Sequence, residues 1–302
     1  MKRVVSVSLG SSERDHRAAV EFLGEKVIVE RIGTDGDFPK VIELVKALDG
    51  QVDAFGMGGI DLFLVAGAKK FVVRDAAKIA AAARKTPIVD GSGLKNTLER
   101  RVVSYLQDKL GITLAGKKVL MVSGVDRFGM AEGFSAAGCE IVFGDLIFAL
   151  GIPFPITTLA GLRRLANLLL PVITRLPFTF LYPTGSKQVE TTPKYGKYYQ
   201  DAEIIAGDFL YIKKYMPPDL TGKLIVTNTV TARDVEELRK RKAALLVTST
   251  PEIQGRSFGT NVIEALLVSF SGKRPEQLGE EDYLRLLDQL HFEPRVVRLS
   301  EQ

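Results

Sequence analysis

One stretch constrains the fold more than any other: Gly116–Asp145 reads GKKVLMVSGVDRFGMAEGFSAAGCEIVFGD. The continuous apolar run Val119–Val122 is typical of a strand that is buried on both faces. A tight turn at Gly124 follows, then a helical segment that Gly138 would end as a C-cap glycine, then a second apolar run at Glu140–Phe143. This order predicts a strand, turn, helix and strand of a doubly wound α/β sheet.

The turn of this unit carries part of the dinucleotide-binding fingerprint G-x-G-x-x-G. Gly124 and Gly129 hold its first and third glycine positions. Asp126 holds the middle position, where its carboxylate would repel a pyrophosphate unless it turns away or Arg127 compensates. Asp145 lies 21 residues after Gly124, close to the spacing at which an acid binds the ribose hydroxyls of NAD. The alternative is a βαβ unit whose glycines only ease packing.

Bulk properties limit the protein class. A chain of 302 residues exceeds the usual size of a single core, so we expect two domains. With 46% hydrophobic and 25% charged residues, the composition is that of an ordinary globular protein. The net charge of +5 is mild, and its densest basic run, Arg239–Lys242, ends a predicted helix, where cations are favoured. We therefore expect no nucleic-acid partner.

Cysteine and histidine are scarce. Cys139 is the only cysteine, which excludes a disulfide framework and a thiolate metal site. His16 and His291 are far apart in sequence, so no metal site is predicted. The N-terminus turns polar too early for a signal peptide, and the apolar region Leu165–Tyr182 is interrupted by two prolines and an arginine. We expect a cytoplasmic protein without a membrane partner; the sequence leaves open whether it forms a homodimer.

Strand and helix patterns alternate along the rest of the chain. We expect strands at 3–9, 26–32, 52–55, 87–89, 119–122, 140–143, 178–182, 203–206, 223–228 and 244–248, with helices between most of them. These patterns predict an α/β substrate-binding domain over 1–110 and a parallel-sheet (Rossmann) domain over 111–255. Residues 256–302 are expected to form C-terminal helices after these two domains.

Polar residues follow several of these strands, at the sheet edge where open α/β proteins bind their ligands. Ser11, Ser12 and Arg14 lie in a loop that could hold a carboxylate, or that could be a surface turn. Asp90, Lys95 and Asn96 follow the strand at 87–89, although Asp90 could instead cap the next helix. The other candidates, assigned to a nucleotide cofactor, are Gly124, Asp126, Arg127, Phe128, Gly129, Asp145, Thr184, Gly185, Gly207, Asp208, Thr227 and Asn228.

The succession Asp90-Gly91-Ser92-Gly93, a helix, Gly116–Leu120 and the turn at Gly124 resembles the domain junction of the shikimate and quinate dehydrogenase family. Gly259–Ala265 resembles the family helix that returns to the first domain and presents a side chain to the substrate, here Glu264. The resemblance thus implies that the helices of residues 256–302 pack back on the first domain.

The resemblance implies a dehydrogenase that moves hydride from the secondary alcohol of a small polyol carboxylate to NAD(P). Asp90 matches the family aspartate that binds this hydroxyl together with a lysine. The family's usual lysine position, within Gly56–Leu62, holds no lysine here, which makes Lys95 the best-placed substitute. NAD is preferred over NADP because a 2′-phosphate would meet the carboxylate of Asp145.

Two other functions remain open from the sequence. One is a methyltransferase that uses S-adenosylmethionine, which needs a similar glycine turn and acid. The other is a two-domain module that binds a nucleotide or metabolite without converting it. The missing family lysine and the acid at Asp126 favour this second alternative.

Overall fold

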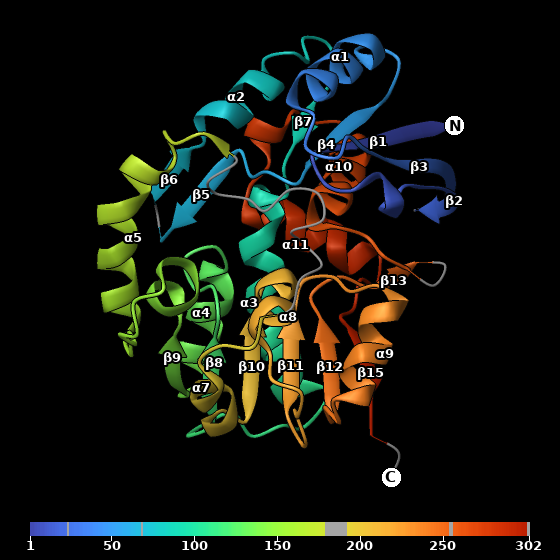
Figure 1. Ribbon diagram of the computed structural model, residues 1–302. Coiled ribbons are helices and arrows are strands. Elements are labelled where there is room, and N and C mark those ends of the chain that lie inside the picture. Colours follow the sequence, from blue (N-terminus) through green and yellow to red (C-terminus); the bar gives the residue numbers. More distant parts are fainter. Residues whose placement is uncertain (23, 68, 179–191, 254–255, 301–302) are drawn as a thin grey trace.

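The computed structural model describes all residues except 23, 68, 179–191, 254–255 and 301–302. It shows two α/β domains, the N-terminal one at the top of Figure 1 and the C-terminal one at the bottom. Each domain has one mainly parallel sheet.

The N-terminal sheet has five strands in the order β2-β3-β1-β4-β7. All neighbours are parallel except β2 and β3, which form an antiparallel hairpin at the edge. The central strand β1 is buried along Val4–Ser8, as its apolar run requires. The strands are β1 (Lys2–Ser8), β2 (His16–Phe22), β3 (Glu25–Gly33), β4 (Ala54–Gly58) and β7 (Ile88–Val89), with α1 (Phe38–Leu48) and α2 (Arg74–Ala80) packed together on one side.

The C-terminal sheet has six strands in the order β15-β12-β11-β10-β8-β9. Five are parallel, and β15 is antiparallel to β12 at the edge. The strands are β8 (Lys118–Met121), β9 (Glu140–Phe143), β10 (Ile204–Gly207), β11 (Leu224–Thr227), β12 (Leu245–Thr248) and β15 (Arg295–Arg298). The helices of this domain are α4 (Phe128–Ala136), the π-helix η2 (Asp145–Ala149), α5 (Leu159–Ile173), α7 (Gly196–Asp201), α8 (Phe209–Tyr215) and α9 (Ala232–Lys240).

The two domains are tied together by segments that cross between them. Helix α3 (Ser92–Asp108) leaves the N-terminal domain and packs on α4. Helix α10 (Thr260–Ser271) returns to pack on β4 and β1, and α11 (Glu280–Gln289) packs on α3. The chain then crosses a third time to form β15. The expectation that 256–302 would only return to the first domain as helices therefore needs correcting, because Arg295–Arg298 completes the second sheet.

Two elements differ from the sequence expectations. The segment His16–Phe22, for which we expected no strand, is strand β2, whose exposed outer positions belong to a sheet edge. A hairpin of β5 (Phe63–Ala66) and β6 (Lys69–Val72) was not expected. The strand expected at 178–182 lies outside the described residues except for Phe178. Short 3₁₀ helices and a small hairpin complete the chain: η1 (Ser12–Arg14), η4 (Pro275–Gln277), β13 (Glu252–Ile253) and β14 (Arg256–Ser257).

Among the described residues, no helix combines the length and the apolar character needed to cross a bilayer.

Candidate functional site

A cleft of about 890 Å³ lies between the two domains, where the carboxyl ends of both sheets meet. Ser8 and Gly58 reach it from β1 and β4 of the N-terminal sheet. Asp208 and Asn228 reach it from the residues after β10 and β11 of the other sheet. The carboxyl ends of parallel strands are where α/β proteins place their ligands, and the volume falls within the range of small-molecule sites.

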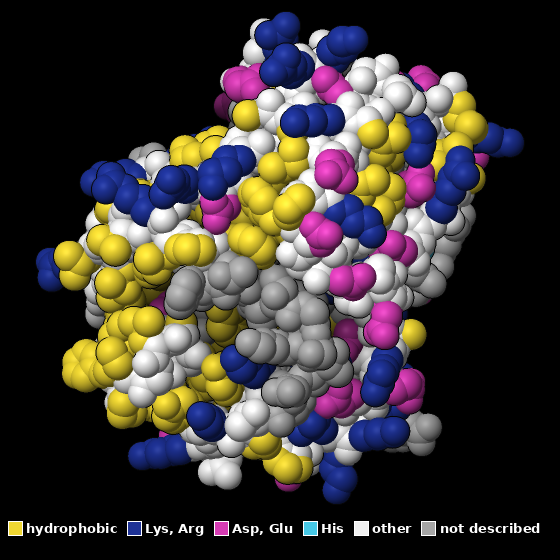
Figure 2. Space-filling model, turned by 45° about the horizontal axis from the view of Figure 1, so that its top comes forward, with side chains coloured by type: hydrophobic (Ala, Val, Ile, Leu, Met, Phe, Trp, Pro, Cys, Tyr) yellow, Lys and Arg dark blue, Asp and Glu magenta, His cyan; other side chains and the backbone are white. Residues whose placement is uncertain are grey.

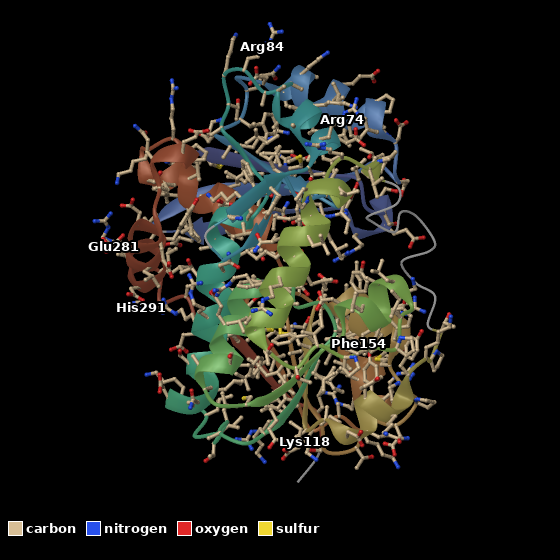
Figure 3. All side chains as sticks on the ribbon, turned by 90° about the vertical axis from the view of Figure 1, so that its left-hand side faces the viewer. Arg74, Arg84, Lys118, Phe154, Glu281 and His291 are labelled. Atoms are coloured by element: carbon tan, nitrogen blue, oxygen red, sulfur yellow. The ribbon has the colours of Figure 1, made fainter. Side chains whose placement is uncertain are left out.

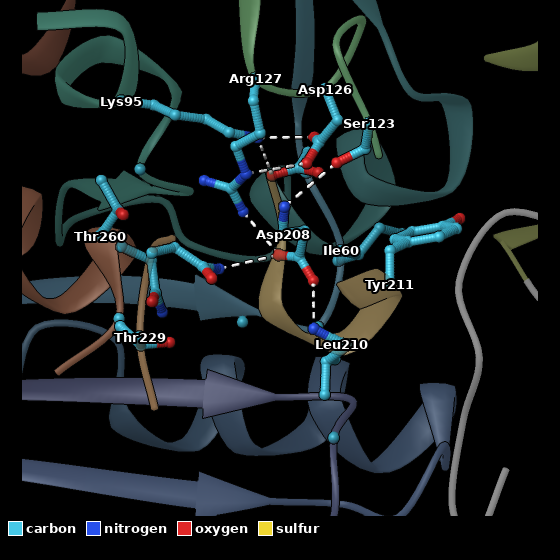
Figure 4. Close-up of a pocket in the computed structure, with 18 of the residues that line it drawn as sticks. Ile60, Lys95, Ser123, Asp126, Arg127, Asp208, Leu210, Tyr211, Thr229 and Thr260 are labelled. Carbon is cyan, nitrogen blue, oxygen red and sulfur yellow. Dashed lines mark hydrogen bonds and ion pairs between the residues drawn. The ribbon is translucent and has the colours of Figure 1, made fainter. Parts of the chain in front are cut away.

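A buried ionic network forms the back of the cleft (Figure 4). The ammonium of Lys95 lies 2.6 Å from a carboxylate oxygen of Asp126. The guanidinium of Arg127 donates to Glu99 at 2.9 Å and to Asp208 at 2.7 Å. Its Nε also lies 3.1 Å from Asp126. Arg127 thereby joins helix α3, the turn after β8 and the end of β10.

The network shifts the pKa of each of its members. Burial and the charge of Arg127 lower the pKa of Lys95, but the carboxylates of Asp126, Asp61 and Glu99 outweigh them and raise it. Burial opposes ionisation of Asp126, yet Lys95 and Arg127 lower its pKa to about 2. Burial raises the pKa of Asp61 to about 6 against the effect of Lys95. Lys95 is therefore a stable cation at neutral pH and a poor proton acceptor.

Asp208 is hydrogen-bonded to residues that follow two other strands of the sheet. Its backbone N–H donates to Ser123 Oγ at 3.1 Å, and the Asn228 amide donates to its Oδ2 at 2.8 Å. Its Oδ1 accepts from the N–H of Leu210 at 2.9 Å, so Asp208 is the N-cap of helix α8. Because β8 and β10 are neighbours in the sheet, these polar groups meet at one edge.

The backbone donors of the glycine turn already have partners. The carboxylate of Asp145 accepts from the N–H groups of Gly124 at 3.0 Å and Val125 at 2.8 Å. The N–H of Gly129 donates to Asn96 Oδ1 at 3.0 Å. These are the groups that would have to bind a pyrophosphate and a ribose in a dinucleotide site. Burial raises the pKa of Asp145 to about 6.

Asp90 lines the cleft, but its carboxylate serves the backbone. One oxygen accepts from the N–H groups of Leu62 and Phe63, and the other from the N–H and hydroxyl of Ser92. Its hydrogen bonds therefore go to β5 and to the first turn of α3, and the expected pairing with Lys95 is replaced by the ion pair of Lys95 with Asp126.

Glu264 does not line the cleft. It is buried in α10, where Tyr283 donates to its Oε1 at 2.7 Å. Burial, followed by the charge of Asp90, raises its pKa to about 8. Glu264 therefore occupies the packing between α10 and α11, away from any ligand in the cleft.

The loop after β1 contributes one cation. Ser12 bonds Asp35 at 2.7 Å and Ser11 accepts from the N–H of Glu13 at 3.2 Å, so both serines shape the turn. Arg14 lines the cleft beside His16. Among the described residues, the guanidinium of Arg14 has no hydrogen bond or ion pair.

Other residues predicted for a cofactor lie elsewhere. Phe128 and Thr227 are buried, Thr227 donating to the carbonyl of Gly207 at 2.8 Å. Gly207 takes a positive φ of 130°, and a side chain there would meet Val122. Thr184 and Gly185 lie outside the described residues.

Sequence reasoning missed four charged residues of this region. Asp61 and Arg233 line the cleft from the loop after β4 and the first turn of α9. Glu99 is buried in α3, and Arg31 is held by Ser8, Ser11 and Asp15. The glycine cluster at Gly56–Gly59 was the available signal for Asp61, because it marks a close backbone approach.

Comparison with known proteins gives two family matches. The family model described as Domain of unknown function (DUF8754) matches residues 93–299, and that described as Domain of unknown function (DUF8753) matches residues 3–90. No curated protein matches the chain.

Solved structures align along most of the chain with low similarity. A solute-binding protein of an ABC transporter from Burkholderia multivorans is 13% identical, with 98% of this chain and 99% of that chain covered and a TM-score of 0.40. GanP, a glucose-galactose binding protein from Geobacillus stearothermophilus, is 13% identical, with 99% and 97% covered and a TM-score of 0.40. An NAD-dependent malic enzyme from Thermotoga maritima is 14% identical, with 96% and 84% covered and a TM-score of 0.35.

These findings correct the expected family, activity and cofactor. The matched families are not the shikimate and quinate dehydrogenases. Within the molecule, Asp145 and Asn96 occupy the backbone donors that NAD would need. The prediction of an NAD-dependent dehydrogenase is therefore wrong.

Proposed function

Since the chain belongs to the family described as Domain of unknown function (DUF8754), we propose its function from its own residues: it binds a small hydroxylated carboxylate between its two domains and releases it unchanged. The observation that carries the proposal is a cleft whose two sides both offer an arginine to a ligand. Arg14 comes from the N-terminal domain and Arg233 from the C-terminal domain.

The two arginines support an anionic ligand. Both line the cleft, and neither makes a side-chain hydrogen bond or ion pair with any described residue. The half-buried Arg31 lies near Arg14, whose charge adds to burial in lowering the pKa of Arg31 to about 10. A guanidinium presents a planar fork of donors that matches a carboxylate, so an acid group would relieve this positive charge.

Hydroxyl groups of the ligand have suitable partners. Thr229, Thr260 and Asn261 line the same cleft and can donate or accept, and Asp61 adds a carboxylate acceptor. A ligand hydroxyl both donates and accepts, so this mixture fits a hydroxy acid better than an entirely apolar ligand.

Binding without conversion follows from the state of the titratable groups. A catalytic base needs a pKa near the working pH. The pKa of Lys95 is raised and that of Asp126 is lowered to about 2, because the two are paired with each other. Lys95 and Asp126 therefore keep their charges at neutral pH, which makes this pair a poor proton donor and acceptor and supports binding without conversion.

Thermal unfolding with a panel of acids and neutral polyols tests the proposal. The panel is 3-hydroxybutyrate, gluconate and glucuronate, against glucose and glycerol. A ligand present at 100 times its dissociation constant stabilises the folded state by about 2.7 kcal/mol. We expect an acid of the panel to stabilise the wild type and to stabilise Arg14→Ala and Arg233→Ala much less.

Arg84→Ala is the matched control, since Arg84 lies at the end of the N-terminal domain away from the cleft (Figure 3). Stabilisation should be unchanged in this variant, and nuclear magnetic resonance of the ligand after incubation should show it intact. Equal stabilisation of all three variants, or conversion of the ligand, would refute the proposal.

A further inference from the structure

One side of the cleft is apolar, in contrast to its ionic back. The wall is built by helix α5 and the π-helix η2, and we call it the α5–η2 wall. Its members are Leu146, Ala149, Leu150, Leu165, Leu169 and Ile173.

Helical spacing gives the wall a continuous surface. Leu165, Leu169 and Ile173 follow one another at intervals of four residues, so they lie along one face of α5. Leu162, which lies near the same face one turn earlier, is fully buried and anchors that end of the helix in the core. The N–H of Arg74 also donates to the carbonyl of Thr174 at 2.9 Å, which ties the end of α5 to the N-terminal domain. The wall is therefore held by both domains.

The wall starts at the ionic back of the cleft. Asp145 is the first residue of η2 and bonds the glycine turn, whereas Leu146 and Ala149 of the same π-helix, and Leu150 at its C-cap, belong to the wall. A ligand bound at the charged residues would meet apolar side chains within one or two turns of this helix.

The wall also continues to the surface. Leu150 lines the cleft and is 51% exposed, and Leu176, just beyond α5, lines it and is 40% exposed. Figure 2 shows hydrophobic side chains gathered on the left-hand side of the molecule, the side on which Figure 1 places α5. A cleft of about 890 Å³ is also much larger than a four-carbon hydroxy acid requires.

We propose that the natural ligand is amphiphilic: a hydroxylated carboxylate whose polar end binds the arginines and whose apolar chain lies along the α5–η2 wall. The inference rests on the proposed function and adds the chemical class of the ligand. Burial of the chain against Leu165 and Leu169 would supply the hydrophobic part of the affinity.

The test is calorimetric titration with a homologous series of 3-hydroxy acids, from 3-hydroxybutyrate to 3-hydroxydodecanoate, each below its micelle-forming concentration. A methylene group buried against the wall should raise the affinity about fourfold. Leu169→Gln should weaken 3-hydroxydecanoate about tenfold and leave 3-hydroxybutyrate unchanged. Leu168→Gln is the matched control, because Leu168 is 73% exposed on the same helix and does not line the cleft.

The outcomes separate the two proposals. Equal affinity along the series would overturn the amphiphilic ligand and leave the proposed function standing. Affinity that rises with chain length but is insensitive to Leu169→Gln, or equally sensitive to Leu168→Gln, would also overturn it, since the chain would then lie elsewhere. No binding of any member, together with no stabilisation by the acid panel, would overturn the proposed function as well.

Discussion

Replacing Arg127 by methionine should destabilise the protein severely. The guanidinium is 6% exposed, donates to Glu99 at 2.9 Å and to Asp208 at 2.7 Å, and lies 3.1 Å from Asp126. Glu99 is itself only 1% exposed, so it would become a buried carboxylate without its cation. Removing one partner of such a pair costs about 3–5 kcal/mol of unfolding free energy.

The loss should grow as the pH rises. Burial raises the pKa of Glu99 in the folded protein, and Arg127 opposes this effect. Without Arg127 the folded pKa of Glu99 rises further above its unfolded value. A carboxyl group with a raised folded pKa contributes stability at low pH, and this contribution is lost as the pH climbs towards the folded pKa. Arg127→Met should therefore be closer to the wild type at pH 5 than at pH 8.

Urea unfolding at pH 5 and pH 8 measures both effects. The control is Arg239→Met, which removes an exposed ion pair with Glu236 and should cost less than about 1 kcal/mol. The double variant Arg127→Met with Glu99→Met should recover part of the loss, because it removes the unpaired carboxylate. A loss no larger than that of Arg239→Met, or one that shrinks as the pH rises, would refute the reasoning.

Three further predictions follow. Burial raises the pKa of Glu264 to about 8 in the folded protein, so the stability that its protonated form contributes is lost as the pH rises. Between pH 5 and pH 8 the unfolding free energy of the wild type should fall by about 3 kcal/mol more than that of Glu264→Gln, and urea unfolding that shows the same pH dependence for both proteins would contradict this. Gly91→Ala should lower the unfolding free energy by more than about 1 kcal/mol, because Gly91 has a φ of 96° and a Cβ there would lie 2.8 Å from the backbone nitrogen of Asn261. An unchanged midpoint of urea unfolding would contradict this, since it would show that the junction of α3 and α10 can relax. Calorimetric titration with NAD should give no binding to the wild type, since Asp145 occupies the donors of Gly124, and saturable heats would contradict that account.

Local elements were predictable because their signals are local. Helix α1 (Phe38–Leu48) lies between the strands predicted at 26–32 and 52–55, as expected, with the side chain of Asp37 as its N-cap. Strand β9 likewise covers the predicted Glu140–Phe143. In both cases the pattern of apolar residues and the flanking cap lie within a few residues of the element.

The site was less predictable because its contacts join distant segments. Lys95 pairs with Asp126, 31 residues later, and Arg127 with Asp208, 81 residues later; no local pattern records either contact. The spacing of Asp145 from Gly124 led to the wrong prediction of a ribose-binding acid, and the reason is physical. Neighbouring parallel strands bring their carboxyl ends together, so an acid at this spacing can satisfy the turn of its own chain as readily as a bound ribose.

The most direct test of the central claim is a calorimetric titration with the hydroxy acid that stabilises the protein most in the thermal panel. We predict saturable one-to-one binding to the wild type and at least about tenfold weaker binding to the double variant Arg14→Ala with Arg233→Ala, as expected for the loss of charged hydrogen bonds. Absence of saturable binding to the wild type, or equal affinity in the double variant, would contradict a ligand held between the two domains by these arginines.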